Sequence, residues 1–291
     1  MSAFLMPNNA EEIYMYTALT IAGSDSSGGA GIQADIKTMT ALGVYGMTAI
    51  TALTAQNTTG VKSIKEVDTD FLRDQLNCVF DDIYPDAVKT GMLPNAGIIE
   101  VVADCLKQRG AKQLVIDPVM VSTSGSALIN EQAVNTLKTK LFPLKGLVTP
   151  NIPEAEVLSD INIETGQDMI RAARIISQRV SGSPAILIKG GHERNTANDL
   201  LYSGDNEIWF NGERIDNPNT HGTGCTLSSA IACNLALGYS MEDSVGNSKR
   251  YISGALKSGL NLGKGSGPLN HVYLFEDNFD SKASAEWRIY G

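Results

Sequence analysis

The sequence is poor in three features, and each shortage excludes a class of protein. No run of apolar residues approaches the about 18 that a membrane-spanning helix needs. The four cysteines show no C-x-x-C spacing, so neither a structural zinc site nor a disulfide framework is expected. Basic residues are outnumbered, 23 Lys and Arg against 32 Asp and Glu, for a net charge of −9. We therefore expect neither nucleic acid nor a membrane as the main partner, although a local basic pocket for a small anion is compatible with this charge.

The first residues of the sequence also lack the pattern of an export signal. Residues 1–16 contain Glu11 and Glu12 and no basic residue, unlike a secretory signal peptide. Because no disulfide framework is expected either, a reducing cytoplasm is the simplest compartment.

The overall composition is typical of a globular protein. Of the 291 residues, 43% are apolar and 19% are charged, which suffices for a large core and argues against disorder. No internal repeat, low-complexity block or long linker divides the chain. We therefore predict one domain over residues 17–275, with terminal extensions at 1–16 and 276–291.

Short apolar segments typical of buried strands alternate with segments of helical periodicity. Strands are predicted at residues 17–22, 47–53, 87–88, 113–116, 147–148 and 185–188. Helices are predicted at residues 32–42, 71–80, 97–106, 131–141, 169–180, 225–237 and 244–260. Residues 199–215 depart from this alternation, because turn signals divide them into antiparallel hairpins at one sheet edge. The whole pattern predicts an α/β sandwich around a mostly parallel sheet.

Residues suited to ligand binding follow the predicted strands. They are Asp25, Gln56, Met92, Asp117, Asn151 and Lys189. Ligands of such sheets bind beyond the carboxyl ends of the strands, so we expect these residues near the functional site.

Residues 220–225, Thr-His-Gly-Thr-Gly-Cys, precede a predicted helix and form the strongest local motif. Two glycines allow a tight turn and close approach to a ligand, and the first free N–H groups of the helix favour an anion. An ordinary loop-to-helix junction with a threonine cap has the same local pattern, so the motif alone leaves both interpretations open.

Residues 23–31 form a second glycine-rich turn. It is not a P-loop, because the Gly-Lys-Ser/Thr ending is absent. The residues from Gly29 to Ala34 match the looser G-x-G-x-x-A dinucleotide pattern, but the next predicted strand ends in Gln56 rather than an acid. An NAD-dependent oxidoreductase is therefore a distant alternative.

Two acids and two lysines are candidates for a nucleotide and its metal ion. Carboxylates at Asp117 and Glu154 could hold Mg²⁺ beside phosphates, while Glu154 could equally favour a helix N-terminus by its charge. Lys189 and Lys264 lie in glycine-rich turns, where each could place a cation beside phosphate or be an ordinary solvated lysine.

Taken together, these motifs resemble the hydroxymethylpyrimidine/phosphomethylpyrimidine kinases of thiamine biosynthesis, within the ribokinase-like superfamily. The resemblance extends over residues 18–271. The matching segments are 19–35, 51–57, 89–93, 117–120, 149–154, 189–192 and 221–225. Each segment alone is modest, but their joint order is highly specific.

The resemblance implies a ribokinase-like three-layer α/β/α sandwich and a kinase that uses ATP and Mg²⁺. Such an enzyme phosphorylates the hydroxymethyl group of 4-amino-5-hydroxymethyl-2-methylpyrimidine and then converts the monophosphate to the diphosphate. Family analogy also implies a homodimer.

Carried over by position, the resemblance assigns a role to each candidate residue. The pyrimidine pocket would be lined by Gly23, Asp35, Gln56 and Met92. The side-chain amide of Gln56 suits this role, since it both donates and accepts hydrogen bonds. Asp35 could instead be an ordinary helix-face acid, and Met92 could be part of the core packing. The nucleotide side would contain Asn151, Lys189 and Lys264, and Asp117 and Glu154 would organise Mg²⁺.

One position departs from the broader superfamily and affects the mechanism. The superfamily has a catalytic aspartate after the glycine-rich anion hole, and this chain has Cys225 there, as the pyrimidine kinases and some pyridoxal kinases do. We expect the amides of Gly222, Thr223, Gly224 and Cys225 to stabilise the transferring phosphoryl group. Whether the Cys225 thiolate takes the proton of the accepting hydroxyl is left open by the sequence.

Two alternatives share most of these motifs. A pyridoxal or pyridoxine kinase has the same scaffold, and Gln56 with Asn57 favours the aminopyrimidine only moderately. A non-catalytic pyrimidine-binding sensor could keep the pocket and lose the phosphate groups, but Asp117, Glu154 and Lys189 are all present. Residues 276–291 lie outside the resemblance and receive no role.

Overall fold

A mostly parallel sheet forms the centre of the molecule in the computed structural model, which describes residues 14–120, 129–180, 184–190, 197–204 and 206–275. Its strands, in spatial order, are β10 (Asn206–Phe210), β9 (Asp199–Ser203), β8 (Ala185–Ile188), β7 (Leu147–Val148), β6 (Leu114–Ile116), β5 (Ala87–Thr90), β1 (Thr17–Ala22) and β2 (Tyr45–Ile50). The strands from β8 to β2 pair in parallel, and β9 and β10 add antiparallel pairs at one edge.

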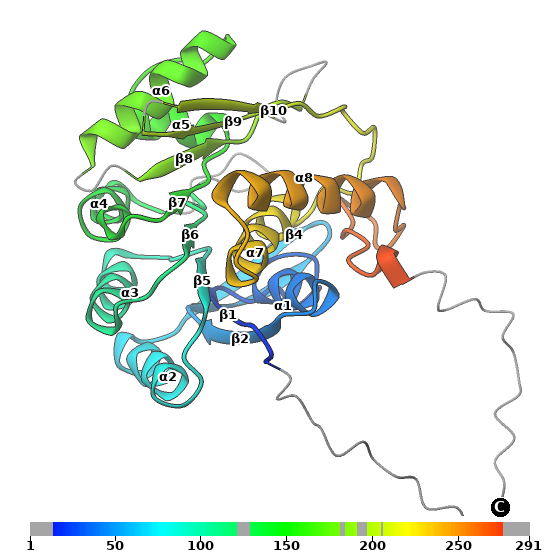
Figure 1. The fold of residues 1–291 in the computed structure, drawn as a ribbon. Coiled ribbons are helices and arrows are strands. Elements are labelled where there is room, and N and C mark those ends of the chain that lie inside the picture. Colours follow the sequence, from blue (N-terminus) through cyan, green and yellow to red (C-terminus); the bar gives the residue numbers. More distant parts are fainter. Residues whose placement is uncertain (1–13, 121–128, 181–183, 191–196, 205, 276–291) are drawn as a thin grey trace, which may run out of the picture.

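Helices cover both faces of this sheet (Figure 1). One face is covered by α1 (Gly31–Ala41), α7 (Thr223–Ala236) and α8 (Met241–Lys257). The other is covered by α2 (Thr69–Asp82), α3 (Ala96–Arg109), α4 (Glu131–Thr136), α5 (Ile152–Ser159) and α6 (Gly166–Arg179); a π-helical turn, Leu137–Leu141, and a 3₁₀ turn, Phe142–Leu144, follow α4. The predicted α/β/α sandwich is confirmed.

The alternation of side chains along each strand builds a core on each face of the sheet. In β6, Leu114 and Ile116 pack into the core beneath α2–α6, whereas Val115 between them packs into the core beneath α7 and α8. In β8, Leu187 likewise faces α7 and α8. Strands buried on both faces require a nearly continuous apolar sequence, which is why these segments were recognisable.

The largest difference from the prediction concerns residues 47–53, expected to form one strand. The chain leaves the sheet after Ile50, and β3 (Ala52–Asn57) pairs with β4 (Gly60–Glu66) in a separate antiparallel hairpin. The turning point is Thr51, whose buried side chain donates a hydrogen bond to the Met92 carbonyl oxygen. The break thus coincides with a contact to a residue 41 positions away, which local sequence could not reveal.

Smaller corrections concern the ends of other elements. Strands β9 and β10 form one hairpin, and the described residues 206–215 contain no third strand near the predicted residues 214–215. Helix α8 spans Met241–Lys257 rather than 244–260, because Ser240 caps its first turn by accepting the Asp243 amide. Within the described residues, no helix is both long and apolar enough to span a membrane.

Candidate active site

The start of α7 lies close to the carboxyl ends of the parallel strands. A methyl group added to Gly224, in the first turn of α7, would lie 3.4 Å from Lys189 Nζ and 3.6 Å from Asp117 Oδ2. Lys189 follows β8, and Asp117 follows β6. The fold thus brings together the predicted phosphate-binding loop, a predicted nucleotide lysine and a predicted metal carboxylate.

The first turn of α7 presents backbone N–H groups in the arrangement of an anion site. The preceding residue, Gly222, has a φ of 82°, and no side chain in the described part of the chain caps this helix. The Thr223 amide donates to the Thr220 carbonyl oxygen and the Thr226 amide to the Gly222 carbonyl oxygen, so the amides of Gly224 and Cys225 remain for a bound anion. The helix dipole adds positive potential at the same point.

The two glycine-rich loops pack backbone against backbone. A methyl group on Gly222 would overlap the carbonyl oxygen of Gly29, so only glycine fits at position 222, which also has a left-handed conformation. The motif at 220–225 is therefore more than an ordinary helix start, because its geometry depends on the loop at 23–31.

Asp25 holds the two loops together, a role that its position after β1 did not reveal. Its Oδ2 accepts the amides of Gly29 and Ala30, at 3.1 and 2.9 Å, and lies 2.8 Å from His221 Nε2. Burial disfavours the charged carboxylate, but hydrogen bonds from His221 and Ser27 outweigh burial and hold the pKa of Asp25 well below its ordinary value. Asp25 is therefore an ionised link between the loops at neutral pH.

Asp117 is a buried carboxylate with three side-chain partners. Lys189 Nζ donates to Oδ1 at 2.9 Å, while the hydroxyls of Thr149 and Ser228 lie 3.3 Å from its oxygens. Burial opposes its charge, but the nearby ammonium groups of Lys189 and Lys89 lower its pKa below the ordinary value. Asp117 is thus a fixed negative charge beside the Gly224 turn.

Glu154 is buried as well, but its pKa shifts in the opposite direction. Burial raises the pKa of Glu154 to about 7, and the negative charge of Asp117 adds to this shift. Burial is the largest cause of this shift, and the nearby ammonium group of Lys189 opposes it.

Glu154 and Asn151 also cap α5 reciprocally. Asn151 Oδ1 accepts the Glu154 amide at 2.8 Å, and Glu154 Oε2 accepts the Asn151 amide at 2.9 Å. The other carboxylate oxygen of Glu154, Oε1, accepts the Met120 amide at 3.3 Å. The helix-capping role considered for Glu154 is therefore present in the structure, next to the carboxylate of Asp117.

The residues predicted for the pyrimidine lie around the loop at 23–31. A methyl group on Gly23 would overlap the Met92 side chain, so these two residues are in contact. The Gln56 side chain, on β3, has its Nε2 at 3.1 Å from His221 Nε2, next to the anion site. Gly23 thus contacts Met92, and Gln56 lies beside His221 of the predicted phosphate loop.

Asp35 differs from the other predicted pyrimidine residues, because its side chain is fully buried. Lys89 Nζ and the Thr20 hydroxyl donate to Oδ2 at 2.8 and 2.6 Å, and the Ser229 hydroxyl donates to Oδ1 at 2.6 Å. Both carboxylate oxygens are therefore occupied by groups from β5, β1 and α7, and Asp35 joins these elements beneath the site.

Lys89 was missed as a functional candidate although it lies in one of the matching segments. It is fully buried, and the positive charge of its ammonium interacts with Asp35, Cys225 and Asp117. The available signal was a lysine within the otherwise uncharged strand 87–90, a position that burial tolerates only when the charge is paired.

Cys225 lies in the first turn of α7 and is half-buried. Burial raises the pKa of its thiol to about 11, and the negative charges of Asp35 and Asp117 add to this effect, while Lys89 opposes it. The cysteine is therefore a thiol at neutral pH.

Lys264, predicted for the nucleotide side, has no contact with Lys189 among the described residues. Its loop follows α8, and its backbone amide donates to the Thr58 hydroxyl in the turn between β3 and β4. Of the matching segment 189–192, Gly191 and His192 lie outside the described residues.

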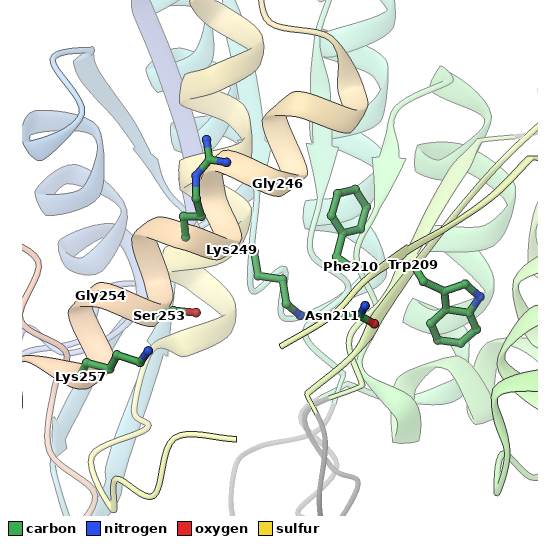
Figure 2. A pocket seen from close by; sticks show the side chains of 9 residues that line it. Trp209, Phe210, Asn211, Gly246, Lys249, Ser253, Gly254 and Lys257 are labelled. Atoms are coloured by element: carbon green, nitrogen blue, oxygen red, sulfur yellow. The ribbon is translucent and has the colours of Figure 1, made fainter. Parts of the chain in front are cut away.

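A cavity of about 570 Å³ lies between β10 and α8. Figure 2 shows Trp209 and Phe210 on its strand side and Lys249, Ser253 and Lys257 on its helix side. Lys249 Nζ donates to Asp199 Oδ2 at 2.5 Å, and Asp199 Oδ1 accepts the amide of Gly190, the residue after Lys189. The cavity is thus linked to the nucleotide side, and no sequence motif indicated it.

Comparison with known proteins gives this geometry a family. The family described as phosphomethylpyrimidine kinase matches residues 25–270. The chain belongs to the phosphomethylpyrimidine kinase family. The match includes every predicted site residue except Gly23, so the motifs recognised in the sequence lie in the segment that defines the family.

Two curated relatives align with similar shares of this chain, but the relatives themselves differ in total length. The hydroxymethylpyrimidine/phosphomethylpyrimidine kinase of Streptomyces coelicolor is 47% identical over 87% of this chain and 93% of the relative. The thiamine biosynthesis bifunctional protein ThiED of Geobacter sulfurreducens is 49% identical over 90% of this chain. The chain spans only 53% of that bifunctional relative, and therefore corresponds to about half of it.

Two solved structures have the same fold. The ADP complex of Bacillus subtilis pyridoxal kinase is 40% identical, with a TM-score of 0.82 over 90% of this chain and 99% of the other. The phosphomethylpyrimidine kinase of Clostridium difficile is 44% identical, with a TM-score of 0.73 over 82% of this chain and 98% of the other. The ribokinase-like fold is thus shared with a pyridoxal kinase and a phosphomethylpyrimidine kinase.

Proposed function

We propose that this protein transfers phosphoryl groups from ATP to 4-amino-5-hydroxymethyl-2-methylpyrimidine and then to its monophosphate, in thiamine biosynthesis. The observation that carries the proposal is the convergence of the uncapped α7 N-terminus with Lys189 and Asp117, where a methyl group added to Gly224 would lie 3.4 Å from Lys189 Nζ. Preorganised N–H groups and a cation are what a transferring phosphoryl group requires. Membership of the kinase family supports the same reaction.

We assign Mg²⁺ to the carboxylates of Asp117 and Glu154. Within the described residues, no set of three or more His, Cys, Asp or Glu side chains is grouped as a protein-only metal site. A pair of acids fits Mg²⁺ nonetheless, because this ion commonly uses one or two carboxylates together with waters and phosphate oxygens. Once bound, Mg²⁺ would neutralise phosphate charge, while Lys189 keeps Asp117 ionised and in place.

In this proposal Gln56, Gly23 and Met92 hold the pyrimidine, and its hydroxyl points toward Cys225. Because the pKa of Cys225 is about 11, its thiol is protonated at neutral pH. We therefore assign to Cys225 a contact with the accepting oxygen and a donating amide, rather than the role of a thiolate base. Alignment and charge stabilisation supply most of the catalysis of phosphoryl transfer, so a strong base is not required.

We propose that the base end of the nucleotide occupies the cavity between β10 and α8. Its volume of about 570 Å³ suits a small-molecule ligand, and it combines the aromatic side chain of Phe210 with the ammonium group of Lys249. The hydrogen bonds from Lys249 to Asp199, and from Gly190 to Asp199, connect this cavity with Lys189. Asn151 and Lys264 remain further candidates for the nucleotide side.

Pyridoxal kinase activity is the second candidate, because a pyridoxal kinase of known structure is 40% identical to this chain and has a TM-score of 0.82. Both substrates are substituted aromatic rings with a hydroxymethyl group, so the same phosphoryl site would serve either. Gln56 favours the aminopyrimidine, since an amide pairs with a ring nitrogen and an exocyclic amine together.

We also propose a single domain over residues 17–275, a homodimer, and a cytoplasmic location. The β3–β4 hairpin supports the dimer, because Leu53, Val61 and Ile64 are 48%, 49% and 50% exposed on it. A two-stranded sheet with exposed apolar side chains gains stability when a second copy covers it.

The direct test is incubation with ATP, Mg²⁺ and the hydroxymethylpyrimidine, followed by mass spectrometry for the mono- and diphosphate, with pyridoxal in parallel. We expect both pyrimidine products, and Lys189→Met should lower turnover by roughly 10²-fold because it removes a preorganised cation. Lys65→Met, on the exposed strand β4, is the matched control. Exclusive phosphorylation of pyridoxal would overturn the pyrimidine assignment, and pyrimidine binding without any phosphorylation would favour a sensor.

A further inference from the structure

The turn between β3 and β4 contacts a loop that lies more than 200 residues away in the sequence. The Thr58 hydroxyl accepts two backbone hydrogen bonds, from the amides of Lys264 at 3.1 Å and Gly265 at 3.2 Å. Two donors converge on one oxygen, so a single side chain joins the hairpin to the loop that follows α8.

The loop fits around Thr58 only because two of its residues are glycine. A methyl group on Gly263 would overlap the Thr58 side chain, and one on Gly265 would overlap the Thr58 carbonyl oxygen. Gly263 also has a φ of +89°, a backbone conformation that other residues rarely adopt. The contact is therefore closely packed as well as hydrogen-bonded.

The hairpin is joined to the pyrimidine side as well. The Gln56 amide donates to Ser26 Oγ at 2.8 Å, and that hydroxyl donates back to the Gln56 carbonyl oxygen at 2.7 Å. The Thr54 hydroxyl donates to the Ser24 carbonyl oxygen at 2.8 Å. Gln56, proposed to bind the pyrimidine, lies only two residues before Thr58.

The loop after α8 is joined to the phosphoryl side. The Gly267 amide donates to Asn219 Oδ1 at 2.9 Å, and the His221 amide donates to the Gly267 carbonyl oxygen at 3.3 Å. His221 in turn lies 2.8 Å from Asp25, in the pyrimidine-side loop. Hydrogen bonds thus connect four segments in a ring around the site, and Thr58 supplies one of the links. The segments are the loop at 23–31, the β3–β4 hairpin, residues 263–267 and residues 219–221.

We propose that Thr58 is a positioning residue that makes the pyrimidine and the nucleotide bind cooperatively. The inference rests on the proposed function, because it takes Gln56 and Lys264 to serve the two ligands. Neither segment is held by the central sheet: the hairpin is a separate two-stranded sheet, and every residue of β4 is exposed. Such segments are weakly ordered alone, so a ligand that orders one of them also orders the other through Thr58, and the second ligand binds more tightly.

The chain offers close controls for this test. Thr58→Val keeps the shape of the side chain and removes the acceptor oxygen, and Thr58→Ser keeps the oxygen. Thr59→Val alters the neighbouring threonine, whose hydroxyl donates to Asn57 Oδ1 within the same turn and, among the described residues, makes no bond to the loop at 263–267. These three variants separate the hydroxyl of Thr58 from general disturbance of the hairpin.

Calorimetry of a non-hydrolysable ATP analogue, with and without the hydroxymethylpyrimidine, measures the cooperativity. We expect the pyrimidine to tighten nucleotide binding at least about fivefold in the parent, in Thr58→Ser and in Thr59→Val, and less than about twofold in Thr58→Val. An unchanged ratio in Thr58→Val would overturn the proposal, as would a parent that binds both ligands independently.

Hydrogen exchange of the ligand-free protein gives a readout that does not depend on the proposed function. We expect the amides of residues 263–267 to exchange at least about tenfold faster in Thr58→Val than in Thr59→Val, since the amides of Lys264 and Gly265 lose their acceptor. Equal exchange would overturn the link between the segments. A parent that fails to bind the pyrimidine would instead refute the proposed substrate, and the exchange result would still decide the role of Thr58.

Discussion

The charged centre beneath α7 and the β3–β4 hairpin differ in almost every physical respect. In the centre, Asp35 and Lys89 are fully buried, and Asp117 is nearly so. On the hairpin, every residue of β4 is exposed and its apolar side chains face outward. In the centre, burial strengthens the electrostatic interactions between the charges, so removing one partner should lower the stability strongly. On the hairpin the side chains are exposed, so a substitution there should change the stability little. Both regions nevertheless contribute to the proposed site, Gln56 from the hairpin and Asp117 from the centre.

The sharpest test of this contrast is Lys89→Met, for which we expect the largest effect. The substitution leaves Asp35 as an unpaired buried charge, so the free energy of unfolding should fall by about 3–5 kcal/mol. Urea unfolding measures this loss. The double variant Lys89→Met/Asp35→Asn should recover part of the stability, because it removes the second charge, and a loss below about 1 kcal/mol would contradict the role given to this pair.

An intermediate effect is expected from Glu154, at the edge of the same centre. Its pKa is raised from 4.5 to about 7, so the folded state binds a proton more readily than the unfolded state. The stability that this proton contributes is complete below about pH 4.5 and is lost as the pH rises through about 7.

Comparison of the parent with Glu154→Gln isolates that contribution. Relative to the variant, the parent should lose at most about 3 kcal/mol of unfolding free energy between pH 4.5 and 7, measured by urea unfolding of the metal-free protein. Effects that are independent of pH, such as a weaker helix cap, change the unfolding free energy equally at every pH and so do not alter its dependence on pH. Parallel curves would show that Glu154 titrates as an ordinary exposed glutamate.

The smallest effect is expected on the hairpin. Ile64→Thr changes a half-exposed side chain of β4, so the unfolding free energy of the monomer should change by no more than about 0.5 kcal/mol. If the hairpin forms the dimer interface, the same substitution should weaken dimerisation in analytical ultracentrifugation. A stability loss above 1 kcal/mol with unchanged assembly would mean that the hairpin packs as firmly as the centre.

Much of the fold was predictable because its signals are local. Strands buried on both faces need continuous apolar segments, and the helices between them have regular apolar spacing, so β1 and the alternation after it could be recognised. The break after Ile50 could not, since it coincides with a contact between Thr51 and the Met92 carbonyl oxygen, which lies 41 residues away. The hairpin that follows was therefore missed.

The candidate site divides in the same way. Lys189 and Asp117 were predictable as neighbours, because residues after parallel strands meet at one edge of the sheet, whereas Gly224 was predicted from the glycine-rich start of a helix. The burial of Asp35 against Lys89, and the role of Asp25 between the two loops, depend on three or more elements coming together. No local sequence pattern indicates that these elements contact one another in the folded protein.

The amino-acid sequence by itself determined the layered α/β architecture, the family, and the residue types that surround the phosphoryl site. Only the tertiary structure decided which of those side chains are buried pairs, which cap a helix, and how Thr58 joins a distant loop. The reason is physical: periodicity and turn chemistry act between neighbours in the chain, whereas the charge state and contacts of a side chain depend on neighbours in space.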